Sequence, residues 1–241
     1  MSTATLEKPA APPVVLPSPM NGHAAPILLS PRYTVADWEA FETGKLHRYQ
    51  LREGRFMEMP GGTYEHSVII GDFGYALTTA VRAVGCETLP SDHRIYIANQ
   101  HGLYADICVL CGKPEINRVA SMLMNPVLIV EVLSQSTAAD DRGDKFARYR
   151  TRPTLKHYVL VEQHKPSVEH FERGDNGIWS LIAEHHDIAE TLILTLNGGT
   201  VAVLLADIYR RVEFAEAEVG VLSPQPPLPQ EGEEVGEEDS E

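Results

Sequence analysis

The sequence predicts a fold of the α/β class, on its border with α+β, in which helices flank a central mixed β-sheet. Segments with the two-residue alternation of strands, together with short apolar runs, recur over most of the chain. Between them lie two segments expected to be helical, 63–84 and 138–150. The chain has 241 residues, of which 43% are hydrophobic, and this is enough for one sizeable core.

The first part of the chain predicts a helix, a hairpin and a long helix. Thr34 and Asp37 have the spacing of a capping pair at the start of a helix over 33–42. The segments 47–51 and 55–59 alternate like the two strands of a hairpin. After a pair of glycines, Thr63 can cap a long helix, because apolar residues recur at helical spacing as far as Val84.

The rest of the chain is rich in predicted strands. The nearly continuous apolar run over 126–133 is typical of a strand covered on both faces. A helix over about 138–150 follows it and ends before Pro153. The other strands are expected over 93–99, 103–111, 156–162, 167–173 and 179–184, and over 199–209 a strand leads into a helical turn. We expect the strands around Asp106, Glu131 and Tyr158 at the centre of the sheet.

The two ends of the chain differ from the middle. We expect a disordered Ala/Pro-rich arm at 1–31, one domain at 32–212 and an acidic, mostly disordered tail at 213–241. The tail holds ten acidic residues and no Lys or Arg, so without it the formal net charge of -14 becomes -4. The negative total therefore does not exclude a nucleic-acid partner.

The cysteines and the apolar segments indicate the cellular compartment of the protein. No signal peptide or membrane-spanning stretch is predicted, and the three cysteines suit a reducing cytoplasm without a disulfide framework. Cys108 and Cys111 have a zinc-like spacing that Cys86 and His93 could complete. Strand alternation, however, puts Cys108 and Cys111 on opposite faces, so buried thiols with a structural role are favoured over a zinc site.

Two acids, Asp106 and Glu131, stand in segments that are otherwise apolar. A buried ionised carboxylate costs several kcal/mol unless a metal ion or a cationic side chain compensates it. Two such acids on neighbouring strands can converge on one Mg²⁺ ion. The alternative is that each acid lies at a strand edge in solvent.

Lys145 is the third candidate. Thr137 and Asp140 have the spacing of a capping box, so a helix is expected to begin there, with Asp141 and Lys145 one turn apart. A short turn ties this helix to the strand of Glu131, so the lysine can reach a metal-bound water or a scissile phosphate. The alternative role is an ordinary salt bridge with Asp141.

The segments "YADICVL", "LIVEVLSQST", "DDRGDKFARYR" and "HYVLVE" together resemble the Uma-two family of restriction-endonuclease-like proteins, within the PD-(D/E)xK nuclease superfamily. The resemblance covers about 33–209. It implies a restriction-endonuclease-like core and hydrolysis of phosphodiester bonds that depends on Mg²⁺, or on Mn²⁺ in its place.

The resemblance also assigns residues. Asp106 matches the metal-binding aspartate, although Ala105 stands where a proline is common, and Glu131 matches the second acid. The backbone carbonyl of Val132 would help to hold the metal. The superfamily lysine usually stands where this chain has Leu133, so Lys145 matches a lysine that has moved to the helix.

Other residues are expected to support these three. His66 is a candidate for a contact to a metal ligand or to phosphate. Glu65 is a candidate for a third acidic metal ligand. Ser134, Ser136 and Asp141 are expected to shape the loop and hold Lys145. The cations in and just after the helix over 138–150 are candidates for contacts to a phosphate backbone, namely Arg142, Arg148, Arg150 and Arg152.

The function expected from these residues is that of a metal-dependent endonuclease, which hydrolyses DNA with a metal-activated water. The catalytic residues would be Asp106, Glu131 and Lys145. The alternative is a module of the same fold, catalytically weak or inactive, that binds nucleic acid or another partner. A cytoplasmic homodimer without membrane association is the expected setting.

Overall fold

The computed structural model describes residues 32–44, 46–59 and 61–214. The expected disordered arm at 1–31 lies outside these residues, as does the expected acidic tail beyond Phe214. The described residues belong to one compact unit. None of its described helices has the length and apolar character needed to cross a membrane.

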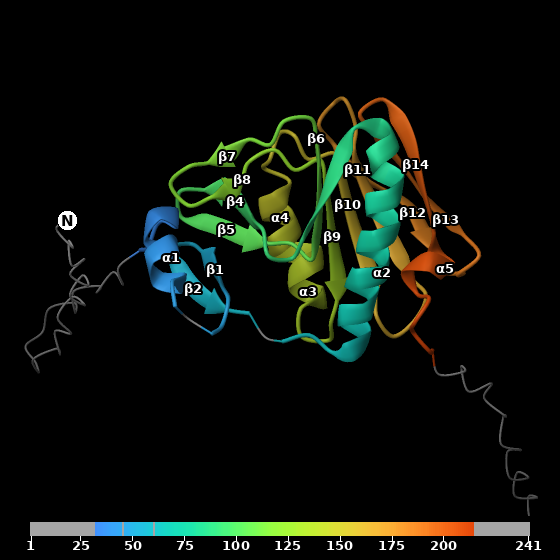
Figure 1. The fold of residues 1–241 in the computed structure, drawn as a ribbon, viewed down its shortest axis with the longest axis horizontal. Helices are drawn as coiled ribbons and strands as arrows, with labels where there is room; N and C mark the ends of the chain where they lie inside the picture. Colours follow the sequence, from blue (N-terminus) through green and yellow to red (C-terminus); the bar gives the residue numbers. More distant parts are fainter. Residues whose placement is uncertain (1–31, 45, 60, 215–241) are drawn as a thin grey trace, which may run out of the picture. The chain divides into compact units, whose positions relative to one another are not determined.

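The fold consists of one long helix, several short helices and three β-sheets (Figure 1). The helices are α1 (Val35–Glu42), α2 (Tyr64–Val81), α3 (Ala138–Asp140), α4 (Phe146–Tyr149) and α5 (Leu205–Ile208), with a 3₁₀ turn η1 (Arg82–Val84) and a π turn η2 (Asp141–Lys145). The strands are β1 (Tyr49–Arg52), β2 (Arg55–Glu58), β3 (Cys86–Pro90), β4 (Arg94–Ala98), β5 (His101–Tyr104), β6 (Ile107–Cys111), β7 (Ile116–Asn117), β8 (Met122–Leu123), β9 (Leu128–Leu133), β10 (His157–Glu162), β11 (Val168–Arg173), β12 (Trp179–His185), β13 (Thr191–Leu196) and β14 (Gly199–Leu204).

The main sheet has the strand order β12-β11-β10-β9-β6-β3 and is mixed. Its two central strands, β9 and β10, run parallel with Glu131 opposite Leu160, and the other pairs are antiparallel. Every residue of β9 is buried, as expected for a strand covered on both faces. The predicted mixed central sheet is therefore confirmed.

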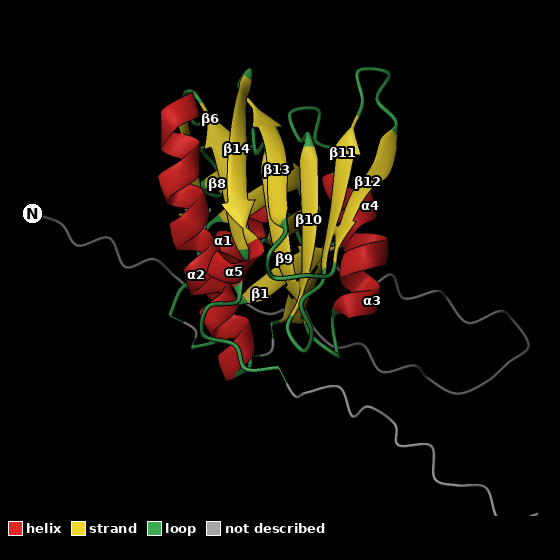
Figure 2. Cartoon of the chain, turned by 90° about the vertical axis from the view of Figure 1, so that its right-hand side faces the viewer, coloured by secondary structure: helices red, strands yellow, loops and turns green. Residues whose placement is uncertain are grey.

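The two faces of the main sheet are covered differently (Figure 2). On one face α2, α5 and the β13–β14 hairpin pack over β6, β9 and β10, where Phe73 and Leu192 are fully buried. On the other face Phe146 and Tyr149 of α4 pack against the same strands. The second sheet, with the order β2-β1-β5-β4-β8-β7, packs Leu51 and Met122 against the buried Trp38 of α1. The described residues thus form three apolar clusters, and two of these lie on the two faces of the main sheet.

The helix starts predicted near Thr34 and Thr63 are confirmed. Thr34 and Asp37 form a complete capping box at α1. The Thr63 side chain accepts a hydrogen bond from the His66 backbone N–H at the start of α2. These caps satisfy backbone N–H groups that a helix leaves without intrahelical partners.

The expected strand over 103–111 is two strands in different sheets. β5 pairs with β1 and β4, whereas β6 joins the main sheet beside β9. Asp106 lies in the bend between them rather than inside a strand. The reason is tertiary: the Asp106 carboxylate accepts the backbone N–H of Val132, at 2.8 Å, where the β6–β9 ladder ends.

The helix expected over 138–150 forms, but its start and middle differ from the prediction. Thr137 provides no side-chain cap, because its hydroxyl contacts the Ser134 hydroxyl at 2.9 Å. The predicted capping box with Asp140 is therefore wrong. The helix also contains the π turn η2, and the Tyr158 hydroxyl donates to the Asp141 carbonyl there at 2.9 Å.

The expectation that the cysteines form no disulfide is also wrong. Cys86 on β3 and Cys111 on β6 lie opposite each other and are disulfide-bonded. The strand β3 was not among the predicted elements, so this pairing had no sequence basis. Cys108 is buried with a free thiol, and it packs on the face opposite to Cys111, as alternation predicts.

The hairpin strand β13 was also missed by the prediction. Its sequence "TLILTL" alternates in burial, with Leu192, Leu194 and Leu196 facing the core. This strand pairs with β14, which was predicted, through six residue pairs. Together they form the two-stranded cover of the main sheet described above.

Candidate active site

A cleft of about 980 Å³ opens at the carboxyl end of β9, and it gathers residues from distant parts of the sequence. One side is built by β1, β2 and the start of α2, and the other by the 134–137 turn and the helix that follows it. The predicted site residues that line this cleft are His66, Asp106, Glu131, Val132, Ser134, Ser136, Asp141 and Lys145. The structure therefore brings most of the predicted site together.

Asp106 is held in the bend that joins the two larger sheets. Its Oδ2 atom accepts the Val132 backbone N–H at 2.8 Å and lies 3.4 Å from Nε2 of His66. Burial alone would raise the pKa of Asp106, but the hydrogen bond from His66, the charge of Lys145 and the Val132 N–H lower it below its usual value. Asp106 is therefore an ionised carboxylate at neutral pH.

Glu131 is buried in the middle of the main sheet, with 1% of its surface exposed. Its Oε2 atom lies 2.6 Å from Nζ of Lys145, whereas Oε1 is buried and makes no hydrogen bond of normal geometry to the described residues. Burial raises the pKa of Glu131 well above its usual value; Lys145 opposes the increase, and Asp106 and Asp141 add to it. Three acids, Asp106, Glu131 and Asp141, therefore share the site with one lysine.

Lys145 lies on the π turn η2 and is buried together with its partners. Its ammonium group contacts Glu131 at 2.6 Å and Asp141 at 3.1 Å. The salt bridge with Asp141, the alternative role, is therefore present, together with a contact to Glu131 that was not predicted. Burial lowers the pKa of Lys145, but the surrounding carboxylates outweigh this and raise it, so the group is charged.

His66 stands at the start of α2, beside Asp106. Burial lowers its pKa, but the hydrogen bond to Asp106, the charge of that carboxylate and the backbone of Val132 produce a net increase. An imidazole with a raised pKa next to an ionised aspartate can hold the carboxylate in one orientation. Glu65, the neighbour of His66, is half-buried and is not among the residues that line the cleft.

The serine-rich turn after β9 is fixed by its own hydroxyl groups. Ser134 Oγ lies 3.1 Å from Ser136 Oγ and 2.9 Å from Thr137 Oγ1. The backbone N–H groups of Ala138 and Thr137 also donate to the Ser134 carbonyl. These bonds shape the loop as predicted, whereas Asp141 is the residue that touches Lys145.

Two of the four predicted phosphate-binding arginines are bound to acids. Arg142 contacts Glu162 at 2.9 Å and Glu169 at 2.5 Å. Arg148 contacts Glu53 at 3.1 Å, in addition to an acid on its own helix. The acids from other elements are distant in sequence, so the apparent excess of cations on the helix is largely compensated in the folded chain.

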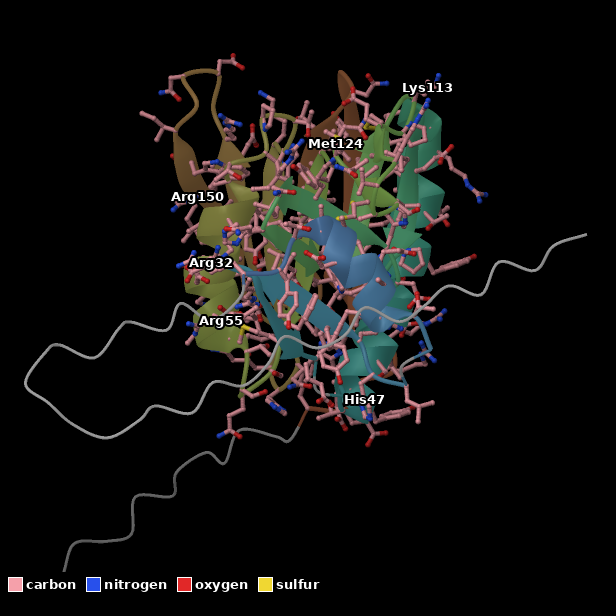
Figure 3. All side chains as sticks on the ribbon, turned by 90° about the vertical axis from the view of Figure 1, so that its left-hand side faces the viewer. Arg32, His47, Arg55, Lys113, Met124 and Arg150 are labelled. Carbon is pink, nitrogen blue, oxygen red and sulfur yellow. A yellow bond between two sulfur atoms is a disulfide. The ribbon has the colours of Figure 1, made fainter. Side chains whose placement is uncertain are left out.

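The other two arginines pack against their surroundings. Arg150, which directly follows α4, is exposed (Figure 3). Its guanidinium lies over the Phe146 ring at 5.0 Å. Arg152 donates to the Met124 carbonyl at 2.5 Å. None of the four arginines is among the residues that line the cleft.

Gln163, His164 and Arg52 are among the cleft residues that were not predicted from the sequence. Gln163 is buried and accepts the Thr63 hydroxyl at 2.7 Å, and His164 lies beside it in the cleft. Both directly follow β10, which runs parallel to β9, and the carboxyl ends of parallel strands meet at one edge of a sheet. That rule would have found them. Arg52 comes from the other sheet, and no local pattern indicates its position.

Comparison with protein families gives one family for most of the domain. Residues 35–197 match the Uma2 family model, which is described as "Putative restriction endonuclease". The match contains the cleft residues named above, from His66 to His164.

Two proteins from Synechocystis are similar in sequence. The uncharacterized protein slr1290 is 30% identical over 185 residues, which is 76% of this chain and 95% of the relative. The uncharacterized protein sll1609 is 29% identical over 150 residues, which is 61% of this chain and 85% of the relative.

A solved structure is similar in fold. It is a crystal structure of a protein from Anabaena variabilis described as a "putative nuclease belonging to DUF820", with a TM-score of 0.59. The similarity covers 73% of this chain and 97% of the other, at 12% sequence identity. The shared feature is therefore the nuclease-like fold.

Proposed function

The chain belongs to the Uma2 family, and from this premise we propose that it is a metal-dependent endonuclease that hydrolyses DNA phosphodiester bonds with a metal-activated water. The observation that carries the proposal is that buried Glu131, half-buried Asp106 and buried Lys145 meet in one open cleft. Buried charges that serve only stability are expensive, because their desolvation offsets much of the Coulomb attraction. A functional role explains why Asp106, Glu131 and Lys145 are kept together.

The residues fit a hard divalent cation such as Mg²⁺ or Mn²⁺, which prefers oxygen ligands. Asp106, Glu131 and the carbonyl of Val132 would hold it. Two observations support the fit: Glu131 Oε1 has no normal hydrogen bond among the described residues, and the acids outnumber the lysine. When bound, such an ion polarises a phosphate and lowers the pKa of a water molecule.

The chain's own groups then have separate tasks. Lys145, held by Glu131 and Asp141, brings a fixed positive charge to the cleft, where it would stabilise the charge that develops on the reacting phosphate. His66 holds the Asp106 carboxylate in place. A non-catalytic binding module, the alternative for this fold, has no need of the uncompensated carboxylates.

Incubation of the chain with supercoiled and linear DNA tests the proposal, with Mg²⁺, Mn²⁺ or EDTA. We expect cleavage with either metal, none with EDTA, and a loss of at least a hundredfold for Glu131→Gln. Glu184→Gln, which changes an exposed acid on β12 in the same way, is the matched control and should cut like the wild type. If Glu131→Gln cuts as fast as the wild type, the proposal is wrong.

A further inference from the structure

A second cluster of metal-ligating side chains lies on the main sheet, away from the cleft. His157 is on β10, and His170 and Glu172 are on β11. In this antiparallel pair His157 is opposite Glu172, and His170 is opposite Val159, so all three side chains share one face. It is the face covered by β13–β14, whereas Glu131 and Lys145 face the α4 side.

The distances within the cluster are close to those of a metal site. His157 Nδ1 lies 3.0 Å from His170 Nε2 and 3.8 Å from Glu172 Oε2, and the three ligand atoms lie within 4.8 Å of one another. Tetrahedral zinc, with bonds of 2.0–2.2 Å, separates its ligand atoms by roughly 3.4 Å. A small movement of the Glu172 side chain, which is 40% exposed, completes this geometry.

The protonation of the histidines suits a metal as well. His157 Nε2 lies 3.0 Å from the Thr195 carbonyl, which can only accept a hydrogen bond, so this nitrogen carries the proton. The lone pair of Nδ1 then points toward His170 and Glu172. The 3.0 Å contact between His157 Nδ1 and His170 Nε2 is then a hydrogen bond that His170 donates, and a bound metal would take the place of that proton.

We propose that His157, His170 and Glu172 form a binding site for a zinc-type divalent ion, separate from the site at Asp106 and Glu131. Two imidazoles and one carboxylate select zinc over Mg²⁺, which prefers oxygen ligands alone. A hydrogen bond from a metal-binding histidine to a backbone carbonyl is the usual support of such a ligand. Through Thr195 on β13, the bound ion ties the hairpin to β10 and β11 and stabilises the fold.

The full chain, stripped with a chelator, is titrated with Zn²⁺ by calorimetry. Glu131→Gln serves as the reference, because it removes a carboxylate from the cleft, where Zn²⁺ could also bind. We expect this reference to bind one Zn²⁺ per chain, and the added change Glu172→Gln to weaken binding at least tenfold. Glu184→Gln in the same background is the matched control and should leave binding unchanged.

Two further readouts protect the test against a folding defect. Glu172 is half-exposed, whereas His170 is buried, so Glu172→Gln is the variant expected to leave the fold intact. Zinc should raise the Tm of the reference but not that of the Glu172→Gln protein. X-ray absorption of the zinc-loaded reference should show two imidazole ligands.

The contrary results are equally plain. If the Glu131→Gln protein binds no zinc, or if Glu172→Gln binds it as tightly as the reference, the cluster is a hydrogen-bonded histidine pair and the proposal is wrong. The calorimetry, the Tm measurement and the X-ray absorption do not involve DNA cleavage. Failure of this proposal therefore leaves the proposed nuclease function untouched, and the reverse is also true.

Discussion

Lys145 makes two buried ion pairs, of which the sequence predicts only the one with Asp141. It makes the local ion pair with Asp141 and also the contact with Glu131 on the neighbouring strand. An exposed pair one helical turn apart contributes only a few tenths of a kcal/mol. This lysine is buried, so its removal leaves a buried carboxylate without a partner, and the expected cost in stability is about 3–5 kcal/mol.

We therefore expect Lys145→Ala to lower both DNA cleavage and stability. If the ammonium group stabilises the reacting phosphate, turnover under saturating Mg²⁺ should fall by roughly two to three orders of magnitude. Lys145→Arg should keep more stability than Lys145→Ala, because it retains the positive charge. Cleavage time courses and urea denaturation measure the two effects, and wild-type cleavage by a folded Lys145→Ala protein would exclude a catalytic role.

The interactions that the sequence predicts and those that it misses differ in the sequence distance between the partners. Asp106, Glu131 and Lys145 were found because charged residues in apolar or one-turn patterns are visible locally. The acids that bind Arg142 and Arg148 come from other elements, at Glu53, Glu162 and Glu169. A local count of charges on the helix had no means to include them.

At the scale of elements, periodicity found the long helix α2 and the buried strand β9, but not the points where tertiary contacts override it. The strand expected over 103–111 is divided because Asp106 takes the Val132 N–H instead of continuing the ladder. The π turn η2 likewise depends on a residue outside its own segment, since Tyr158 on β10 binds the Asp141 carbonyl. Such partners have no signature in the local sequence.

Tyr158→Phe tests the role of this bond in η2. The ring stacked on Phe146 is kept, and only the hydroxyl that donates to the Asp141 carbonyl is lost. A buried carbonyl without its donor costs about 1–3 kcal/mol. We expect this loss in urea denaturation, with reduced turnover at unchanged KM, because Lys145 shares the turn. Tyr75→Phe, at an exposed position of α2, is the control, and equal behaviour of the two variants would contradict the prediction.

At the scale of the whole molecule, the charge of the chain opposes the binding of a polyanion. The formal net charge is -14, and seven acidic residues lie after position 219. Their removal halves the negative charge. These acids can weaken DNA binding by electrostatic repulsion of the phosphates. Salt screens this repulsion, and the screening length is about 10 Å at 0.1 M.

We expect a chain shortened after residue 219 to bind DNA more tightly than the full chain, most of all at low salt. A control chain of full length, in which the seven acids become the matching amides or serines, should show the same increase if charge is the cause. Fluorescence anisotropy with a labelled duplex, at several salt concentrations, measures the affinity. Equal affinities at low salt would remove any electrostatic role for this segment.

The bend at Asp106 has a mechanical consequence for the cleft. The walls of the cleft belong to two different sheets, and the chain passes from one to the other at this residue. Across the opening of the cleft, Arg52 on β1 forms an ion pair with Asp140 on α3, with 2.6 Å between the guanidinium and the carboxylate. A movement of the two sheets apart would lengthen the Arg52–Asp140 ion pair and turn the bend at Asp106, so the width of the cleft and the position of the Asp106 carboxylate are linked.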